Sequence, residues 1–410
     1  MRVLYVTYNG LTEPLGERQV LPYVIGLAAR GWEYTVLSFE KEETAGVESM
    51  ARVRRRLSER GIRWHPLRYH RRPTLPATAY DGLRGMIEGL TADRRVDLIH
   101  ARSTVPATIA RTLAPLRRAP WIFDVRGLVA REYADAGHWP PNGWLFRLTE
   151  RVERTLLRAA DGLVFLTDRI RRDLSEKGLV PTDRPTAVIP CAVDTTVFKP
   201  QAAERRRIRA DLGLGDSPVL VYSGSLGSWY RFEEMLDFFL VARQRIPGLR
   251  FLVVTLNPEI AAKAVLARRL ESDVTVVRVE AGDVPAYLSA ADVGICFLGE
   301  SASKAASSPT KYGEYLASGL PVVTNRWTGD AATLDAEAPW LLIDGFEQAE
   351  YSQTASRLDA LLADPLRTRD ASRALAARGF GLEGALERYD ALYRRVVGRA
   401  SRANTTPRQR

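Results

Sequence analysis

Residues 307–323 read Ser-Ser-Pro-Thr-Lys-Tyr-Gly-Glu-Tyr-Leu-Ala-Ser-Gly-Leu-Pro-Val-Val, which predicts a loop, a short helix, a stop and a strand. Ser308 is expected to cap the helix, Pro309 suits its first position and Gly319 suits the position that ends it. The apolar run at the end predicts a buried strand. A helix N-terminus carries partial positive charge and unpaired N–H groups. With Lys311 beside it, this end of the helix is a candidate anion site.

The same stretch allows two interpretations. Glu314 follows Lys311 by three residues, and its carboxylate could accept hydrogen bonds from sugar hydroxyls. The pair therefore suggests a grip on a phosphorylated sugar or a nucleotide. Ordinary helix capping would use the same Ser-Pro start and Gly end, so the rest of the chain has to decide between the two.

Length and composition set the broad class. The chain has 410 residues, which favours two domains, and an apolar share of 46%, which is normal for a globular protein. Its apolar runs are far shorter than the roughly 20 residues of a membrane span. No signal-peptide cleavage pattern follows the first strand, so we expect a cytoplasmic protein. The two cysteines, Cys191 and Cys296, provide neither a disulfide framework nor a zinc spacing.

The net charge of +10 indicates anionic partners. Nine of the arginines fall between Arg52 and Arg72, interleaved with Trp64 and Tyr69 and accompanied by one acid, Glu59. An anionic membrane surface at the inner face of the plasma membrane, or nucleic acid, could bind there. A solvated helix followed by a loop explains the same pattern. We expect no nucleic-acid partner and keep peripheral membrane contact as a prediction.

Strand and helix patterns alternate along the whole chain, as in a parallel doubly wound sheet. The first series ends near residue 190, and a second begins near residue 219. We therefore predict an α/β protein with two Rossmann-like domains that face a cleft. The expected parts are residues 1–193, residues 205–381, a helix over residues 382–400 and a disordered tail over residues 401–410.

Several common sites are missing from the sequence. No Gly-x-Gly-x-x-Gly follows the first strand, and the chain has no Walker A loop and no His-Glu-x-x-His. The four histidines are not spaced as a metal pair, and no two aspartates lie two residues apart. We therefore expect no metal and no cofactor. If the chain binds a sugar nucleotide, N–H groups, lysine and arginine must meet the charge of its diphosphate.

Taken in order, five pieces of the chain resemble the glycosyltransferases of the GT-B fold, and more narrowly the bacterial family 4 group of retaining enzymes. They are residues 13–23, residues 100–103 with 123–127, the interdomain segment 188–198, the loop 222–230 and the opening stretch 307–323. This resemblance implies that a sugar moves from a nucleotide diphosphate to an acceptor hydroxyl with its anomeric configuration kept. It implies a donor on the second domain, an acceptor on the first and a last helix that crosses back to the first.

The resemblance also suggests roles for particular residues. The negative charge that develops on the departing phosphate needs aimed donors, and we assign that work to Lys311, with Arg231 as a second cation. We expect Asp124 and Arg126, which end a strand of the first domain, to meet the sugar or the acceptor. The remaining donor-side candidates are Gly16, Ser225, Ser307, Ser308, Pro309, Thr310 and Glu314, and the acceptor-side candidates are Glu17, Gln19, His100 and Arg102.

Plain structural explanations stay open for several of these residues. His100 could be a buried structural histidine, Asp124 could cap a helix or pair with Arg126, and Gln19 could lie on a helix surface. The chain also departs from the family pattern, because Ala306 replaces a usual carboxylate and the loop near Ser225 lacks the usual cations. These departures shift weight to Lys311.

The resemblance leaves three classes of acceptor open: lipid-linked oligosaccharides, cell-wall polymers and small natural products. The alternatives to a transferase are an epimerase or hydrolase of sugar nucleotides with the same fold, or a non-catalytic basic binding protein.

Overall fold

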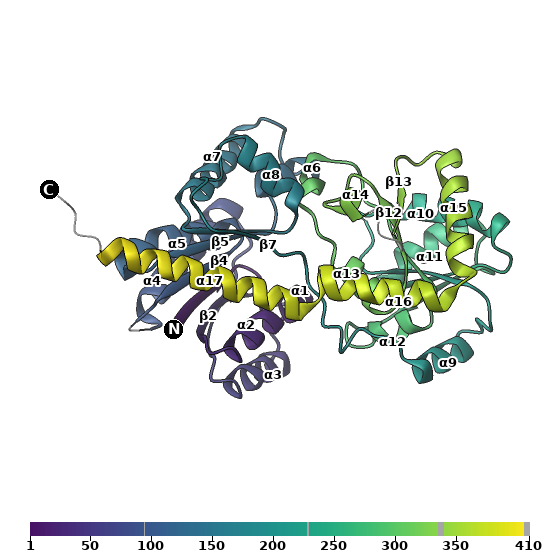
Figure 1. The fold of residues 1–410 in the computed structure, drawn as a ribbon, viewed down its shortest axis with the longest axis horizontal. Coiled ribbons are helices and arrows are strands. Elements are labelled where there is room, and N and C mark those ends of the chain that lie inside the picture. The colour runs from purple at the N-terminus through teal and green to yellow at the C-terminus, as the bar shows by residue number, and fades with distance from the viewer. Residues whose placement is uncertain (94, 228, 335–339, 406–410) are drawn as a thin grey trace. The chain divides into compact units, whose positions relative to one another are not determined.

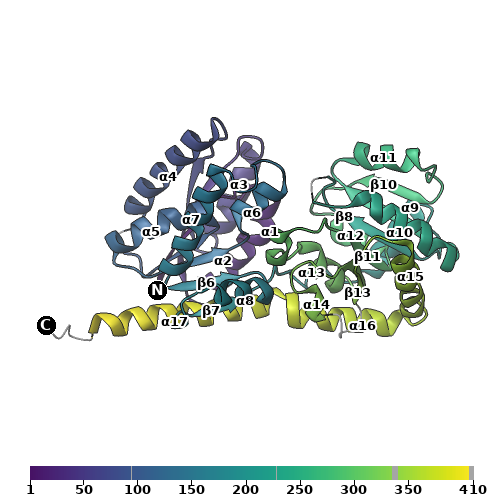
Figure 2. The ribbon, with the colours of Figure 1, turned by 90° about the horizontal axis from the view of Figure 1, so that it is seen from above.

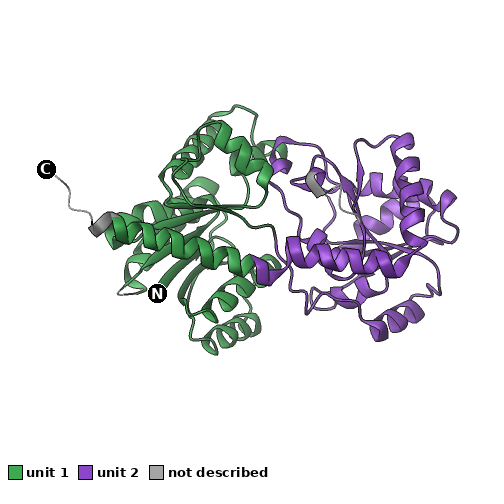
Figure 3. Cartoon of the chain, viewed as in Figure 1, with its two compact units in different colours: residues 1–190, 385–410 green, residues 191–384 purple. Residues whose placement is uncertain are grey.

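The computed structural model describes residues 1–93, 95–227, 229–334 and 340–405 (Figure 1). The chain divides into two compact units, one of residues 1–190 and 385–410 and one of residues 191–384 (Figure 3). Each unit is built on its own parallel sheet with flanking helices. The predicted α/β class, with two doubly wound Rossmann-like domains, is confirmed. The structure divides the chain at residues 190 and 384, where the sequence suggested 193 and 381.

The sheet of unit 1 has seven parallel strands whose order reverses between β1 and β4. In sheet order they are β3 (Arg63–Arg68), β2 (Glu33–Glu40), β1 (Arg2–Thr7), β4 (Leu98–Arg102), β5 (Trp121–Val125), β6 (Gly162–Phe165) and β7 (Thr186–Val188). Strand β3 corrects an expectation, because the sequence suggested a loop after the arginine-rich helix. Its charged ends and Pro66 hide the strand pattern, which an edge strand tolerates because it pairs on one side only.

Helices cover both faces of this sheet. On β2, Phe39 contacts the helix α4 and Tyr34 contacts the C-terminal helix α17, so these two helices lie on opposite faces. Helix α5 contacts both α4 and α7 on the first of these faces (Figure 2). The helices of unit 1 are α1 (Pro14–Gln19), α2 (Leu21–Ala28), α3 (Val47–Ser58), α4 (Thr74–Thr91), α5 (Thr104–Arg117), α6 (Val129–Asp135), α7 (Trp144–Ala159) and α8 (Asp168–Glu176).

Helix α17 (Leu382–Thr405) returns to unit 1 and packs across its sheet. Its Leu386 fills the space that a Cβ on Gly26 would occupy, and its Asp390 accepts a hydrogen bond from the indole of Trp32 at 2.7 Å. Because the helix continues to Thr405, the expected disorder over residues 401–405 is wrong. The rest of that expected tail, residues 406–410, lies outside the described residues.

The sheet of unit 2 has six parallel strands, and its order reverses between β8 and β11. In sheet order they are β10 (Val274–Arg278), β9 (Arg250–Thr255), β8 (Val219–Ser223), β11 (Val293–Cys296), β12 (Val322–Asn325) and β13 (Trp340–Ile343). Buried side chains form one apolar cluster on each face, which explains why these strands read as continuous apolar runs. Strand β13 lies at the edge of this sheet.

Helices surround this second sheet as well. They are α9 (Ala202–Asp211), α10 (Phe232–Arg245), α11 (Pro258–Ala267), α12 (Val284–Ser289), the short helix η1 (Ala302–Ala306), α13 (Thr310–Ala317), α14 (Ala331–Leu334), α15 (Gln348–Leu362), α16 (Pro365–Leu375) and η2 (Ala376–Phe380). None of the helices in the described part of the chain has the length and apolarity that a membrane crossing requires.

Candidate functional site

In unit 2, three segments meet where the strand order reverses. Open α/β sheets bind ligands at the carboxyl ends of their strands, at this reversal point. The loop after β8 lies beside the loop after β11, because Tyr230 forms a bridge with Leu298 and the N–H of Gly299 donates to the carbonyl of Trp229 at 3.0 Å. Helix α13 starts at the end of the second loop, so the stretch 307–323 lies at this point of the sheet.

Lys311 points from α13 back to the loop after β8. Its side chain is buried, and its Nζ lies 3.8 Å from the ring centroid of Tyr230 and 5.3 Å from that of Tyr222. Gly224 makes room for it, since a Cβ there would lie 2.6 Å from the ammonium nitrogen. Burial opposes the charged form of Lys311, but Tyr230 and Glu314 outweigh it and raise its pKa above the ordinary value. The structure therefore holds a buried cation at neutral pH.

A second buried cation, Lys304, lies over the ring of Trp229, the residue before Tyr230, and was missed from the sequence. Its exposed fraction is 6%, and its Nζ lies 3.5 Å from the ring centroid of Trp229. Lys304 of η1 and Lys311 of α13 thus cover the rings of two consecutive residues in the loop after β8. A cation over an aromatic face gains up to about 2 kcal/mol when water is excluded. We call Lys304, Lys311, Trp229 and Tyr230 the lysine cluster. Ion–ring contacts have no sequence period, so only the scarcity of lysine in this chain could have suggested it.

The start of α13 differs from the prediction. Pro309, not Ser308, occupies the cap position, and no side chain caps the helix. Ser308 instead accepts a hydrogen bond from the N–H of Cys191 at 3.1 Å, so its hydroxyl fastens the interdomain segment. Thr310 is the first helical residue. The predicted helix end is confirmed, because Gly319 follows the last turn with a φ of +84°.

The other donor-side candidates of unit 2 differ in burial and in hydrogen bonding. Glu314 is buried on α13, and Ser307 donates its N–H to the carbonyl of Lys304 at 3.1 Å. Ser225 is exposed, and its carbonyl accepts a hydrogen bond from the Tyr222 hydroxyl.

Arg231, the predicted second cation, is the candidate that the structure weakens most. Its Nε donates to Glu234 at 2.7 Å, and the guanidinium lies 5.6 Å from the ring of Phe346. The hydrogen bond to Glu234 raises the pKa of Arg231 further above its ordinary value. The role of Arg231 stays a prediction, and Lys304 is a further candidate for the second cation.

In unit 1, the corresponding reversal point lies between β1 and β4. Arg102 at the end of β4 donates to the side chain of Asn9 after β1 at 3.0 Å, so both loops are joined there. Ser103 follows with a φ of +80°, an uncommon backbone conformation that concentrates at functional sites. Gly16 lies close to the carbonyl of Gly10, because a Cβ would approach that oxygen to 1.9 Å. The close packing of this loop therefore explains by itself why residue 16 is a glycine.

Two acceptor-side candidates lie on α1. Glu17 is partly exposed and pairs with Arg52 at 2.9 Å. Gln19 is buried, where a helix surface was one alternative, and accepts a hydrogen bond from Tyr23 at 3.3 Å. The role of both residues stays a prediction.

Asp124, His100 and Arg126 form one buried network under α17. Oδ2 of Asp124 accepts hydrogen bonds from Arg126 at 2.8 Å, from Tyr389 at 3.0 Å and from His100 Nε2 at 3.2 Å. His100 Nδ1 faces the hydroxyl of Tyr393 at 2.6 Å. The two tyrosines belong to α17, so this network joins the last helix to strands β4 and β5.

The charges in this network are fixed by their neighbours. Burial lowers the pKa of His100, so its ring is neutral at pH 7, with the proton on Nε2 facing the carboxylate. Burial opposes the charge of Asp124, but Arg126 and His100 hold its pKa well below the ordinary value. Oδ2 of Asp124 helps to seat α17, whereas its buried Oδ1 has no hydrogen-bond partner among the described residues, so the expectation that Asp124 and Arg126 meet a ligand stays a prediction.

The chemistry that unit 2 can perform follows from its charges. Two buried ammonium groups lie over consecutive aromatic residues, and Lys311 lies in the first turn of α13, so this part of unit 2 suits an anion that carries more than one phosphate. Among the described residues, no group of three His, Cys, Asp or Glu side chains is placed to hold a metal ion.

Comparison with known proteins agrees with this arrangement. Residues 16–192 match the model of the glycosyl transferase 4-like domain, and residues 217–364 match that of the glycosyl transferases group 1. In fold, the chain is similar to Anabaena Alr3699/HepE in complex with UDP and glucose, with a TM-score of 0.68 and 17% identity over 95% of this chain and 98% of that one.

Two curated relatives match parts of the sequence. A GDP-mannose-dependent alpha-(1-6)-phosphatidylinositol monomannoside mannosyltransferase of Mycolicibacterium smegmatis is 27% identical over 48% of this chain and 51% of its own length. An alpha-D-kanosaminyltransferase of Streptomyces kanamyceticus is 23% identical over 60% of this chain and 63% of its own length. The two domain models together span most of the sequence, in the order in which the two sheets occur. The chain therefore belongs to the GT4-like glycosyltransferases of the GT-B fold.

Proposed function

We propose that this protein transfers a sugar from a nucleoside diphosphate sugar to an acceptor hydroxyl, with the anomeric configuration kept and without a metal ion. The observation that carries the proposal is the lysine cluster at the reversal point of the second sheet. Lys304 and Lys311 are buried beside the N-terminus of α13 and can meet the diphosphate charge that a metal meets elsewhere. Glu314 is the candidate for the hydroxyl groups of the nucleotide ribose.

The reaction breaks the bond between the anomeric carbon and the β-phosphate oxygen and forms a bond from that carbon to the acceptor oxygen. The acceptor proton passes to the departing phosphate, which becomes more basic as the bond breaks. Negative charge grows on this phosphate in the transition state, and donors fixed in place before the reaction stabilise it without reorganising. Lys311 is the residue that we assign to this role, with Lys304 and the first N–H groups of α13 in support.

The acceptor is proposed as a glycolipid or a small natural product. The names of the two curated relatives support these classes, since one acts on a phosphatidylinositol mannoside and the other transfers kanosamine. Membrane contact at the cytoplasmic face stays part of this proposal, and the arginines between Arg52 and Arg72 are the surface that the sequence suggests for it. In the structure Arg52, Arg63 and Arg68 of this segment form ion pairs.

A panel of UDP- and GDP-sugars, each incubated with the protein and a set of hydroxyl acceptors, tests the proposal. Product analysis by NMR should show one donor consumed, a glycoside of unchanged anomeric configuration and equal rates with and without EDTA. Consumption of the donor in the absence of any acceptor would instead identify a hydrolase or an epimerase. A product of inverted configuration, or a rate abolished by EDTA, would contradict the mechanism.

A further inference from the structure

Helix α4 packs on the sheet of unit 1 with the side that carries its smallest residues. Its buried positions are Ala77, Asp81, Gly85 and Gly89. A Cβ on Gly85 would lie 2.7 Å from Ile109, and one on Gly89 would lie 2.5 Å from Leu113, so the helix backbone approaches α5 closely. The large apolar residues of α4 are therefore not needed for this packing.

Those large residues face outward. The exposed fractions of Leu75, Tyr80, Leu83, Ile87 and Leu90 lie between 42% and 52%. The last four recur at intervals of three and four residues, which places them in one stripe along the helix. A surface helix of a globular protein normally turns such a stripe to the core. In α4 the large apolar residues face solvent and the small residues face the core. Contiguous exposed apolar surface of this kind marks an interaction site.

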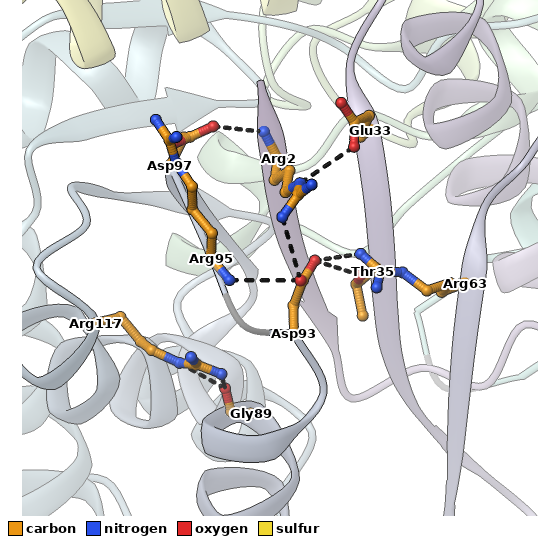
Figure 4. A network of polar contacts seen from close by, with 9 residues as sticks. All are labelled: Arg2, Glu33, Thr35, Arg63, Gly89, Asp93, Arg95, Asp97 and Arg117. Atoms are coloured by element: carbon orange, nitrogen blue, oxygen red, sulfur yellow. Dashed lines mark hydrogen bonds and ion pairs between the residues drawn. The ribbon is translucent and has the colours of Figure 1, made fainter.

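Polar contacts hold α4 at its middle and at its C-terminal end. In the middle of the helix, Asp81 accepts hydrogen bonds from Tyr8 at 2.9 Å and from the backbone of His70 at 3.0 Å. At its end, Asp93 meets Arg2 and Arg63 at the amino ends of β1 and β3, and Arg117 of α5 donates to the carbonyl of Gly89 (Figure 4). The stripe is thus presented on a helix that is fixed to the sheet.

The exposed charges around the stripe are mostly positive. Helices α4, α5 and α7 carry four carboxylates among their described residues; two are buried, and the side chains of the other two are 30% and 29% exposed and paired. Asp81 and Glu153 are buried, Glu88 contacts His65 at 2.7 Å, and Glu150 pairs with Arg154 at 3.1 Å. The exposed charged residues of the three helices are all arginines, namely Arg84, Arg111, Arg147, Arg151, Arg154 and Arg158. Trp144 and Leu148 add exposed apolar surface at the start of α7.

We propose that this face, defined by the exposed residues of α4, α5 and α7, docks on an anionic lipid bilayer, with the α4 stripe inserted at the level of the headgroups. An apolar stripe next to arginines is the pattern of an interfacial helix, and each arginine near an anionic bilayer adds about 1 kcal/mol. A second copy of the chain is a poorer occupant, because a self-complementary contact would oppose like charges. Nucleic acid would satisfy the arginines but would leave Leu83 and Ile87 without an apolar partner.

Co-sedimentation of the full chain with vesicles, in the absence of nucleotide, tests this surface. The chain should bind vesicles of phosphatidylcholine with phosphatidylglycerol, bind poorly to phosphatidylcholine alone, and bind less as salt rises. The double variant Leu83→Ser, Ile87→Ser should bind about tenfold more weakly or less, because two exposed apolar side chains lose their lipid contact. The matched control Leu266→Ser, Leu366→Ser changes two exposed apolar residues of unit 2 and should bind as the wild type does. Thermal midpoints of both variants should match the wild type, since all four residues are exposed.

A charge pair of variants separates this face from the arginine-rich helix α3. Arg147→Gln with Arg151→Gln should weaken vesicle binding severalfold, whereas Arg55→Gln with Arg56→Gln should change it less. The reverse order would assign the contact to α3 and overturn the proposal. Wild-type vesicle binding by the variant Leu83→Ser, Ile87→Ser would also overturn the proposal. The same holds if this variant changes self-association alone or RNA binding alone. Because no nucleotide is present, failure here leaves the proposed sugar transfer standing.

Discussion

Replacing Asp124 by asparagine removes the negative charge that faces Arg126 inside unit 1 while keeping the size of the side chain. The carboxylate oxygen accepts hydrogen bonds from Arg126, His100 and Tyr389, and all four side chains are buried or nearly so. Removing one partner of a buried ion pair costs about 3–5 kcal/mol, because the other charge stays buried without compensation. For a unit of about 200 residues, that loss corresponds to a melting transition lowered by roughly 6–20 °C.

Calorimetric melting of the wild type and of Asp124→Asn measures this shift, with two controls. Glu42→Gln breaks an ion pair of the same unit with Arg68, but both partners are exposed, so its cost should stay below about 1 kcal/mol. Asp124→Asn combined with Arg126→Met removes both charges and should recover much of the lost stability. An asparagine variant that melts like the wild type and yet loses turnover would refute the structural role and restore Asp124 as a catalytic residue.

Three further predictions concern other buried groups. Burial raises the pKa of Glu153 from its ordinary value of 4.5 to about 7, so its stabilising contribution is present below pH 4.5 and lost as the pH rises to 7; relative to Glu153→Gln, the wild type should lose up to about 3 kcal/mol of unfolding free energy over that range in denaturant titrations. Gly224→Ala should cost about 1–3 kcal/mol and weaken nucleotide binding in calorimetry, because the backbone has a φ of +138° and the new methyl group meets Lys311. Lys304→Met should keep the thermal midpoint, since the thioether can lie over Trp229, and lower turnover about a hundredfold. The first prediction fails if the stability difference between wild type and Glu153→Gln does not change with pH. The second fails if Gly224→Ala binds the nucleotide as the wild type does, and the third fails if Lys304→Met keeps wild-type turnover.

The sequence predicted the fold well because its signals are local. Apolar runs bounded by turn residues gave the buried strands of both sheets, and a glycine with left-handed backbone gave the end of α13. Strand β3 escaped because an edge strand is solvated on one side and can carry charges and Pro66. The end of the last helix was not predicted correctly, because its final turns are as polar as a loop.

The site was predictable only where one residue type implies one chemistry. A lysine beside a helix start, Lys311, predicts an anion site, and the structure adds its aromatic partners. Lys304 could not be found this way, because its importance depends on a ring that lies 75 residues earlier in the chain. Asp124 follows the rule that strand ends carry ligands, but a helix more than 260 residues later supplies the partner that buries it. Long-range contacts of this kind leave no local pattern.

The central claim, that the lysine cluster holds the diphosphate of a sugar nucleotide without a metal, is tested most directly by calorimetric titration. UDP and GDP are each titrated into the wild type and into Lys311→Met in the presence of EDTA. One of the two nucleotides should bind the wild type, and the variant should bind it roughly tenfold to a hundredfold more weakly, the scale of a lost hydrogen bond to a charged group. Equal affinity in the variant, or binding that EDTA abolishes, would contradict the account.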